Sequence, residues 1–268
     1  MSDSLALILG EDPLAGLATV LLYVNLAAAL AVLAILPLRA PLRRLIGPAG
    51  AYQLWWLPVI AAALAGVLFL TIEPEYRLTA PAPGPALLWT WAAGAALMAS
   101  AFGLAQARFG RELRQGLSGP AVVGLISPRI VMPADDGRYS EVERELIRAH
   151  ERQHIARKDT RAVAFLALVR CLFWFNPLLH LAAGFLRLDQ EIACDAAVVN
   201  ARPAARALYA RALLKTQLAA TPLPLGCYWP ARGAHPLEIR LGLLKRGRLA
   251  ISGRAQGSLA GPVDAIRP

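Results

Sequence analysis

Three uncharged apolar stretches near the amino terminus constrain the fold of this chain more than any other feature. They run from Leu14 to Leu36, from Ala51 to Ile72 and from Ala86 to Ala105. Each contains the roughly 20 apolar residues that a helix needs to cross the hydrocarbon core of a bilayer. Because 57% of the 268 residues are hydrophobic and only 17% are charged, the sequence predicts three transmembrane helices and a lipid bilayer as partner.

The charged residues around these stretches predict how the chain is oriented. Lys and Arg accumulate in cytoplasmic loops. Three arginines follow the first stretch and three follow the third, namely Arg39, Arg43, Arg44, Arg108, Arg111 and Arg114. The loop at 73–85 has one Arg and two Glu. We therefore expect a multi-pass protein of the bacterial inner (cytoplasmic) membrane, with the N-terminus outside and everything after Ala105 in the cytoplasm. Acidic residues precede the first stretch, which favours a retained anchor over a cleaved signal.

The net charge of +10 does not indicate nucleic-acid binding. The basic residues are spread over several segments, without a basic stripe that carries interleaved aromatic residues. The three cysteines, Cys171, Cys194 and Cys227, form no CxxC pair and are odd in number. Neither a disulfide framework nor a thiolate zinc site is therefore predicted, and we expect reduced, structural thiols.

The segment that follows the third apolar stretch has the character of a β-hairpin and then of a helix. Residues 121–133 are rich in β-branched side chains and are broken by Gly124 and Pro128, which predicts a short, bent hairpin or edge strand. Such an edge can bind an extended substrate through main-chain hydrogen bonds. Ser140 and Glu143 then form a capping box, which predicts a helix to about Arg157.

Two more helices are expected after this one. Asp159 is interpreted as the N-cap of an apolar helix over 160–175, and Asn176-Pro177 ends that helix and starts another, which continues to about Asn200. The stretch 162–186 is long enough for a fourth span, but it contains Arg and His. A crossing there would place Glu191 on the opposite side of the membrane from His150, two residues that the motif described next brings together, so we expect a buried or re-entrant helical hairpin.

The sequence His150-Glu151-Arg152-Gln153-His154 is an HExxH motif on a predicted helix. Residues four apart on a helix project from the same face, so both imidazoles can bind one zinc ion. Glu151 lies beside them and can reach a metal-bound water as the catalytic general base.

A zinc site of this kind needs one more protein ligand, and His2Glu is the set typical of such peptidases. Glu191 is the best candidate because Asp195 lies four residues later on the same helical face. One of these carboxylates can bind zinc while the other fixes a ligand histidine through its second ring nitrogen.

Other polar residues are expected to have structural or solvated roles. His180 shares a helical stripe with Glu191, but eleven residues of helix span about 16 Å, too far for the same metal ion. His235 is also interpreted as structural. No oxyanion-stabilising residue is identifiable among the polar residues of the next helix, Arg206, Tyr209 and Arg211.

Three motifs, in order, carry a family resemblance. They are His-Glu-x-x-His-x-x-Arg-Lys-Asp at 150–159, Phe-Trp-Phe-Asn-Pro-Leu at 173–178 and Asp-Gln-Glu-Ile-Ala-Cys-Asp-Ala-Ala-Val at 189–198. Together with Pro-Arg-Ile-Val-Met-Pro at 128–133, they resemble the BlaR/MecR-type antirepressor metallopeptidases of bacterial membranes, a gluzincin-like group. The resemblance covers most of residues 10–245.

The resemblance implies a cytoplasmic zinc protease in which Glu191 is the third metal ligand and Asp195 is the carboxylate behind a ligand histidine. It also implies a regulatory role, in which a cytoplasmic partner such as a winged-helix transcriptional repressor is cleaved. Sensors of that family continue into another span and an extracellular ligand-binding domain. This sequence has neither, so a β-lactam stimulus is not expected.

These observations together predict a mainly α fold. Three N-terminal transmembrane helices precede a gluzincin-like zinc-peptidase domain with a small β-hairpin. The membrane anchor is expected at 1–107, the cytoplasmic peptidase domain at 108–230, and a basic, solvated C-terminal tail near anionic lipid at 231–268.

Two other functions are open at this point. A housekeeping zinc peptidase that degrades membrane proteins would use the same site. A non-catalytic membrane signal transducer would keep the fold to bind a partner, but the intact Glu151 disfavours it. An intramembrane protease is disfavoured because the helix around His150 carries many charges.

Overall fold

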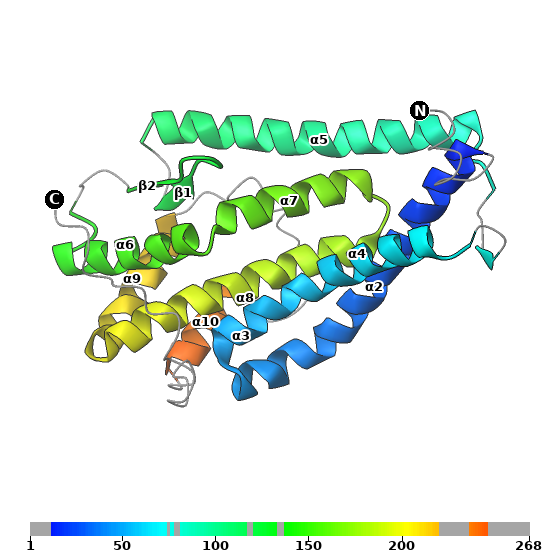
Figure 1. The fold of residues 1–268 in the computed structure, drawn as a ribbon. Coiled ribbons are helices and arrows are strands. Elements are labelled where there is room, and N and C mark those ends of the chain that lie inside the picture. Colours follow the sequence, from blue (N-terminus) through cyan, green and yellow to red (C-terminus); the bar gives the residue numbers. More distant parts are fainter. Residues whose placement is uncertain are drawn as a thin grey trace.

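The computed structural model describes residues 12–73, 76–77, 81–116, 120–132, 137–219 and 236–245 (Figure 1). Within these ranges the chain is mainly helical, with one small antiparallel sheet, as predicted. Three parts can be followed in Figure 1: an N-terminal helical hairpin, the long helix α5, and a helical body. Helix α5 spans Pro85–Arg114, and the body comprises α6 (Glu141–Ala156), α7 (Asp159–Leu172), α8 (Pro177–Ala201), α9 (Arg206–Ala219) and α10 (Pro236–Lys245).

The N-terminal hairpin is one helical run that reverses direction. Asp12 caps its first helix by accepting hydrogen bonds from the amides of Leu14 and Ala15. The reversal occurs at Gly47, whose φ of 80° is left-handed and suits glycine. The later helix then packs back along the first. The elements are α2 (Pro13–Leu45), α3 (Gly47–Gln53), the 3-10 turn η1 (Leu54–Trp56) and α4 (Leu57–Thr71).

The number of candidate membrane spans differs from the prediction. Two helical segments in the described part of the chain, Pro13–Thr71 and Pro85–Arg114, are long and apolar enough to cross a membrane, so the prediction of three separate spans is wrong. The reason is the tight reversal at Gly47, which joins the first two apolar stretches into one run. The second arm of that run is made of α3, η1 and α4, which follow one another without a break from Gly47 to Thr71.

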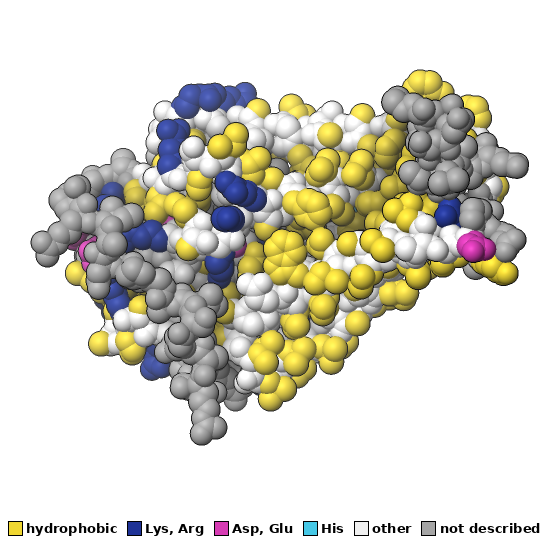
Figure 2. All heavy atoms as spheres, in the orientation of Figure 1, with side chains coloured by type: hydrophobic (Ala, Val, Ile, Leu, Met, Phe, Trp, Pro, Cys, Tyr) yellow, Lys and Arg dark blue, Asp and Glu magenta, His cyan; other side chains and the backbone are white. Residues whose placement is uncertain are grey.

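The apolar surface of the molecule is segregated from its basic surface. Figure 2 shows hydrophobic side chains over the face formed by α4, α7 and the first part of α5 (Pro85–Arg114), whereas Lys and Arg gather toward the end of α5 and α6. In the most apolar part of each candidate span, only 17% of the residues in Pro13–Thr71 and 6% of those in Pro85–Arg114 are buried. The core helices of a soluble protein are mostly buried. This distribution is that of a membrane protein.

The predicted hairpin is confirmed in the region after α5. Strand β1 (Ala121–Val123) pairs antiparallel with β2 (Arg129–Val131), with Ala121 opposite Val131. Gly124 has φ of 102°, and a Cβ atom there would lie 2.5 Å from the carbonyl oxygen of Ser127. The turn therefore requires glycine.

The helix that carries the HExxH motif is also confirmed. Helix α6 (Glu141–Ala156) begins with the predicted capping box, in which Ser140 and Glu143 bond each other's backbone amides. Glu143 is almost fully buried and also accepts hydrogen bonds from Lys215 at 2.7 and 2.8 Å. The start of the motif helix is thereby fixed to α9.

The two helices predicted after the motif helix are present. Helix α7 (Asp159–Leu172) is followed by α8 (Pro177–Ala201), which Asn176 caps as predicted. The N-cap assignment of Asp159 is wrong. Lys158 occupies that position with φ of 59°, and Asp159 is the first helical residue, with its carboxylate turned toward the preceding helix.

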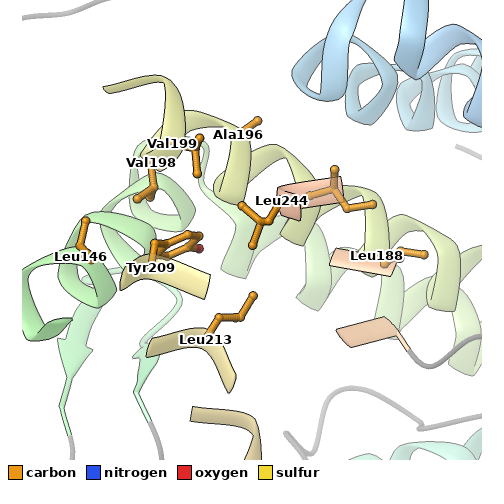
Figure 3. Close-up of a cluster of buried hydrophobic side chains, with 9 residues drawn as sticks. Leu146, Leu188, Ala196, Val198, Val199, Tyr209, Leu213 and Leu244 are labelled. Carbon is orange, nitrogen blue, oxygen red and sulfur yellow. The ribbon is translucent and has the colours of Figure 1, made fainter. Parts of the chain in front are cut away.

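The core of the helical body lies between α6, α8, α9 and α10. Leu146, Tyr209 and Leu244 meet there from three helices (Figure 3). The remaining elements are η3 (Pro203–Ala205), α9 (Arg206–Ala219) and α10 (Pro236–Lys245). The expectation of a solvated tail is wrong for 236–245, because that segment forms a helix that buries Leu244 and Arg240.

Candidate metal centre

Helices α6 and α8 bring three of the predicted site residues together. His150 Nε2 lies 3.2 Å from His154 Nε2, because the two histidines are one helical turn apart. Glu191 Oε2 is 3.3 Å from His150 Nε2, and Glu191 Oε1 is 3.5 Å from His154 Nε2. With metal bonds of about 2.0–2.1 Å, the corners of a tetrahedral zinc site are about 3.3–3.4 Å apart. The three side chains are therefore spaced as zinc ligands are.

The second ring nitrogen of His150 is held by Tyr209 and Asp195. The Tyr209 hydroxyl donates to Asp195 Oδ1 at 2.6 Å and lies 2.8 Å from His150 Nδ1. Since its single proton goes to the carboxylate, the hydroxyl accepts from the Nδ1–H of His150. This tautomer leaves His150 Nε2 free for a metal ion. Asp195 also lies 3.5 Å from His150 Nδ1, so it supports this histidine mainly through Tyr209.

The second ring nitrogen of His154 is held by Asp159. The carboxylate oxygen Oδ2 lies 2.7 Å from His154 Nδ1 and accepts its proton, which again leaves Nε2 for a metal ion. Arg157 donates to the same oxygen at 2.6 Å. Sequence reasoning missed this role of Asp159, although the residue ends the motif at 150–159. An acidic residue near the start of a helix is equally typical of an N-cap, which is the role that the sequence suggested for Asp159.

The electrostatics of the site suit metal ligation. Burial raises the pKa of Glu191, but the charge of Arg240 and the contacts with His150 and His154 outweigh it and hold the pKa well below its usual range. Glu191 is therefore a carboxylate at neutral pH. Burial raises the pKa of Glu151, which is 9% exposed and lies directly after His150. A carboxylate with a raised pKa is suited to proton transfer near neutral pH.

Arg240 of α10 is a site residue that sequence reasoning missed. Its guanidinium donates to both oxygens of Asp195 at 2.8 Å and lies 2.9 Å from Glu191 Oε2. The side chain is 5% exposed, and its two carboxylate partners raise its pKa well above the usual range against the effect of burial. Arg240 lies in the segment predicted as a basic tail, and no local sequence motif distinguishes it from the other basic residues there.

Cys194 also lies at the site, contrary to the expectation of a purely structural thiol. Its sulfur is 3.5 and 3.6 Å from the two ring nitrogens of His154, and His150, His154 and Cys194 form a group that could hold a metal ion. Metal ligands must be deprotonated. Burial raises the pKa of the Cys194 thiol, whereas Arg240 and the two histidines hold the pKa of Glu191 low, so Cys194 and Glu191 are alternative third donors and Glu191 is the more readily ionised of the two.

The other polar residues singled out in the sequence lie apart from this centre. His180 accepts a hydrogen bond from Arg170 and contacts the carbonyl oxygen of Trp174, which is a structural role, as expected. Arg206 and Arg211 are exposed on α9. His235 and Cys227 lie outside the described residues.

Comparison with known proteins points to one family. The family model described as BlaR1 peptidase M56 matches residues 104–244, a range that includes every site residue named above. Regulatory protein BlaR1 of Bacillus licheniformis is 34% identical over 84 residues, which cover 31% of this chain and 14% of that protein. The chain thus matches a small part of this relative's length. No solved structure matches.

Proposed function

The chain belongs to the BlaR1 peptidase M56 family, and from that premise and the geometry of the metal centre we propose that it is a membrane-anchored zinc metalloendopeptidase. The observation that carries the proposal is the spacing of His150, His154 and Glu191, whose closest donor atoms are 3.2–3.5 Å apart. Both histidines have their Nδ1 atoms engaged, so their Nε2 atoms are presented together.

The chain's own residues divide the chemistry between them. His150, His154 and Glu191 would hold the zinc ion, which when bound supplies Lewis acidity toward the scissile carbonyl and lowers the pKa of water toward neutrality. Glu151 takes the proton of the attacking water and later passes it to the leaving amine. Its burial, which raises its pKa, keeps it able to accept and to release that proton.

We further propose that the peptidase is regulatory and cleaves a cytoplasmic protein, such as a winged-helix repressor. The relative from Bacillus licheniformis bears the name of a regulatory protein. The orientation predicted from the arginine-rich segments, with the site on the cytoplasmic side, is consistent with such a substrate. The ion pairs of Arg39 and Arg43 with Asp189 support this orientation. The two arginines lie between the first two apolar stretches, and Asp189 lies on the helix that carries Glu191.

The test is cleavage of casein and of a candidate repressor by the detergent-purified full chain. Glu151→Gln is expected to abolish cleavage while zinc stays bound, because only the base is lost. Glu145→Gln is the matched control, since Glu145 lies on the same helix and pairs with Arg202 at the surface. Retained cleavage by Glu151→Gln would refute the assignment. Zinc binding without cleavage by the wild type would favour the transducer function.

A further inference from the structure

The reversal segment of the N-terminal hairpin (residues 39–55) reaches the metal centre from outside the region that the family model matches. It joins α2 to α4 and packs on α8, where Tyr52 and Trp55 share a buried cluster with Ala182 and Ala193. Figure 1 shows the two segments side by side. The polar contacts that accompany this packing lead to the metal ligands.

The first contact leads to His154. Tyr52 is 9% exposed, and its hydroxyl donates to Asp159 Oδ1 at 3.1 Å, while the other oxygen of that carboxylate holds His154 Nδ1 at 2.7 Å. Gln190 donates to the same hydroxyl at 3.4 Å, and the guanidinium of Arg157 lies 4.9 Å from the centre of the Tyr52 ring. Tyr52 therefore restrains the carboxylate that orients a ligand histidine.

The second contact leads to the helix of Glu191. Asp189 lies two residues before Glu191 on α8 and is 1% exposed. Arg39 donates to both of its oxygens at 2.8 Å, and Arg43 and the indole of Trp55 add bonds of 3.1 and 3.0 Å. A buried carboxylate with four donated hydrogen bonds fixes the position of α8 against the hairpin. The reversal segment thus contacts α8 directly and reaches His154 of α6 through Asp159.

We infer that Tyr52 is a positioning residue of the metal centre, which acts on His154 through Asp159. The N-terminal hairpin is then part of the peptidase site as well as a membrane anchor. This inference rests on the proposed function, because it assumes that His154 binds zinc. Residues that hydrogen-bond a metal ligand typically change metal affinity by about 10–100-fold when they are replaced. Tyr52 is one contact further from the metal ligand than Asp159. We therefore expect loss of its hydroxyl to weaken zinc affinity by about 3- to 10-fold.

The experiment measures the zinc affinity of the full chain in detergent, by competition with a chelator of known affinity. Tyr52→Phe removes the hydroxyl and keeps the ring in its cluster. Tyr23→Phe is the matched control, because it makes the same change in the same hairpin, where the Tyr23 ring packs against Phe69. Asp159→Asn and the double variant complete a cycle that tests whether Tyr52 acts through Asp159.

The expected result is weaker zinc binding by Tyr52→Phe, unchanged binding by Tyr23→Phe, and a double variant that binds zinc as Asp159→Asn does. Unchanged affinity in Tyr52→Phe beside a zinc-binding wild type would overturn this inference and leave the proposed function intact. A purely structural role would lower the melting temperatures of the zinc-free Tyr52→Phe protein without changing zinc affinity, and would also overturn it. A wild type that binds no zinc would overturn the proposed function itself.

Discussion

Arg240 Nη1 lies 2.9 Å from Glu191 Oε2, and this contact connects α10 to the third candidate metal ligand. Glu191 Oε2 is therefore engaged by a cation, while Oε1 lies 3.5 Å from His154 Nε2. Glu191 would then join His150 and His154 in the set of three protein ligands that catalytic zinc sites use. The same guanidinium neutralises Asp195, which is fully buried behind His150. Helix α10 thus completes the centre.

Replacement of Arg240 by Ala should destabilise the protein and weaken zinc binding. Removal of one partner from a buried ion pair costs about 3–5 kcal/mol, because the remaining charge is left without compensation. Thermal unfolding in detergent measures the loss. Arg211→Ala, at an exposed position on α9, should unfold like the wild type. Equal melting temperatures for the two variants would contradict the role given to Arg240.

Tyr209→Phe should lower zinc affinity by about 10-fold while the fold persists. The ring stays in the core beside Leu146 and Leu244, but His150 Nδ1 loses the acceptor that fixes its tautomer. Chelator competition measures the affinity, and far-ultraviolet circular dichroism checks the fold. An affinity equal to that of the wild type would mean that Asp195 alone suffices to orient His150.

Cys194→Ser distinguishes the two candidate ligand sets. If Glu191 is the third ligand, the serine variant should retain about one zinc ion per chain, because the thiol takes no part in ligation. The serine oxygen can still accept from Arg157, which lies 2.9 Å from the sulfur. Elemental analysis of the purified variant gives the answer. Loss of the metal would assign the site to His150, His154 and Cys194.

Glu143 should make the stability of the protein depend on acidic pH. Burial raises the pKa of Glu143, but the bonds from Lys215 and from the Ser140 amide outweigh it and place the pKa below its ordinary value of 4.5. The stability that this group contributes is fully present above its unfolded pKa, and it is lost as the pH falls through the lower folded pKa. The pH is therefore varied downward from about 6 to below that ordinary value.

Melting temperatures over that range check the prediction. Glu143→Gln should be less stable than the wild type at pH 6, and the difference should shrink as the pH falls. Glu145→Gln on the same helix is the control, because that side chain is 56% exposed and should leave the pH dependence unchanged. A difference between Glu143→Gln and the wild type that does not change with pH would contradict the assignment.

Sequence reasoning succeeded where the information was local. The capping box at Ser140, the HExxH helix, the hairpin at 121–133 and the Asn176 cap depend on residues within a few positions of one another, and the structure contains each of them. Family membership followed from the same short motifs. Their order along the chain made the family recognisable before any contact was known.

Two of the misses, Arg240 and Tyr52, came from long-range contacts, whereas Asp159 lies only five residues after His154 and was missed because an acidic residue at a helix start is equally typical of an N-cap. Arg240 and Asp159 have ordinary local surroundings, and only the packing of α10 on α8 and the turn at Lys158 place them at the site. Tyr52 lies in an apolar stretch that reads as a membrane helix, yet its hydroxyl reaches a carboxylate far along the sequence. The number of spans was wrong because the helix resumes at once after the reversal at Gly47, so the two apolar stretches that the arginines separate in the sequence form one helical run.

The zinc content of the detergent-purified full chain tests the central claim most directly, with Glu191→Ala and Glu151→Gln measured beside the wild type. The account predicts about one zinc ion per chain in the wild type, the stoichiometry of a single catalytic centre. It also predicts loss of the metal in Glu191→Ala and its retention in Glu151→Gln. A wild type without zinc, or a Glu191→Ala variant that binds zinc as tightly as the wild type, would contradict it.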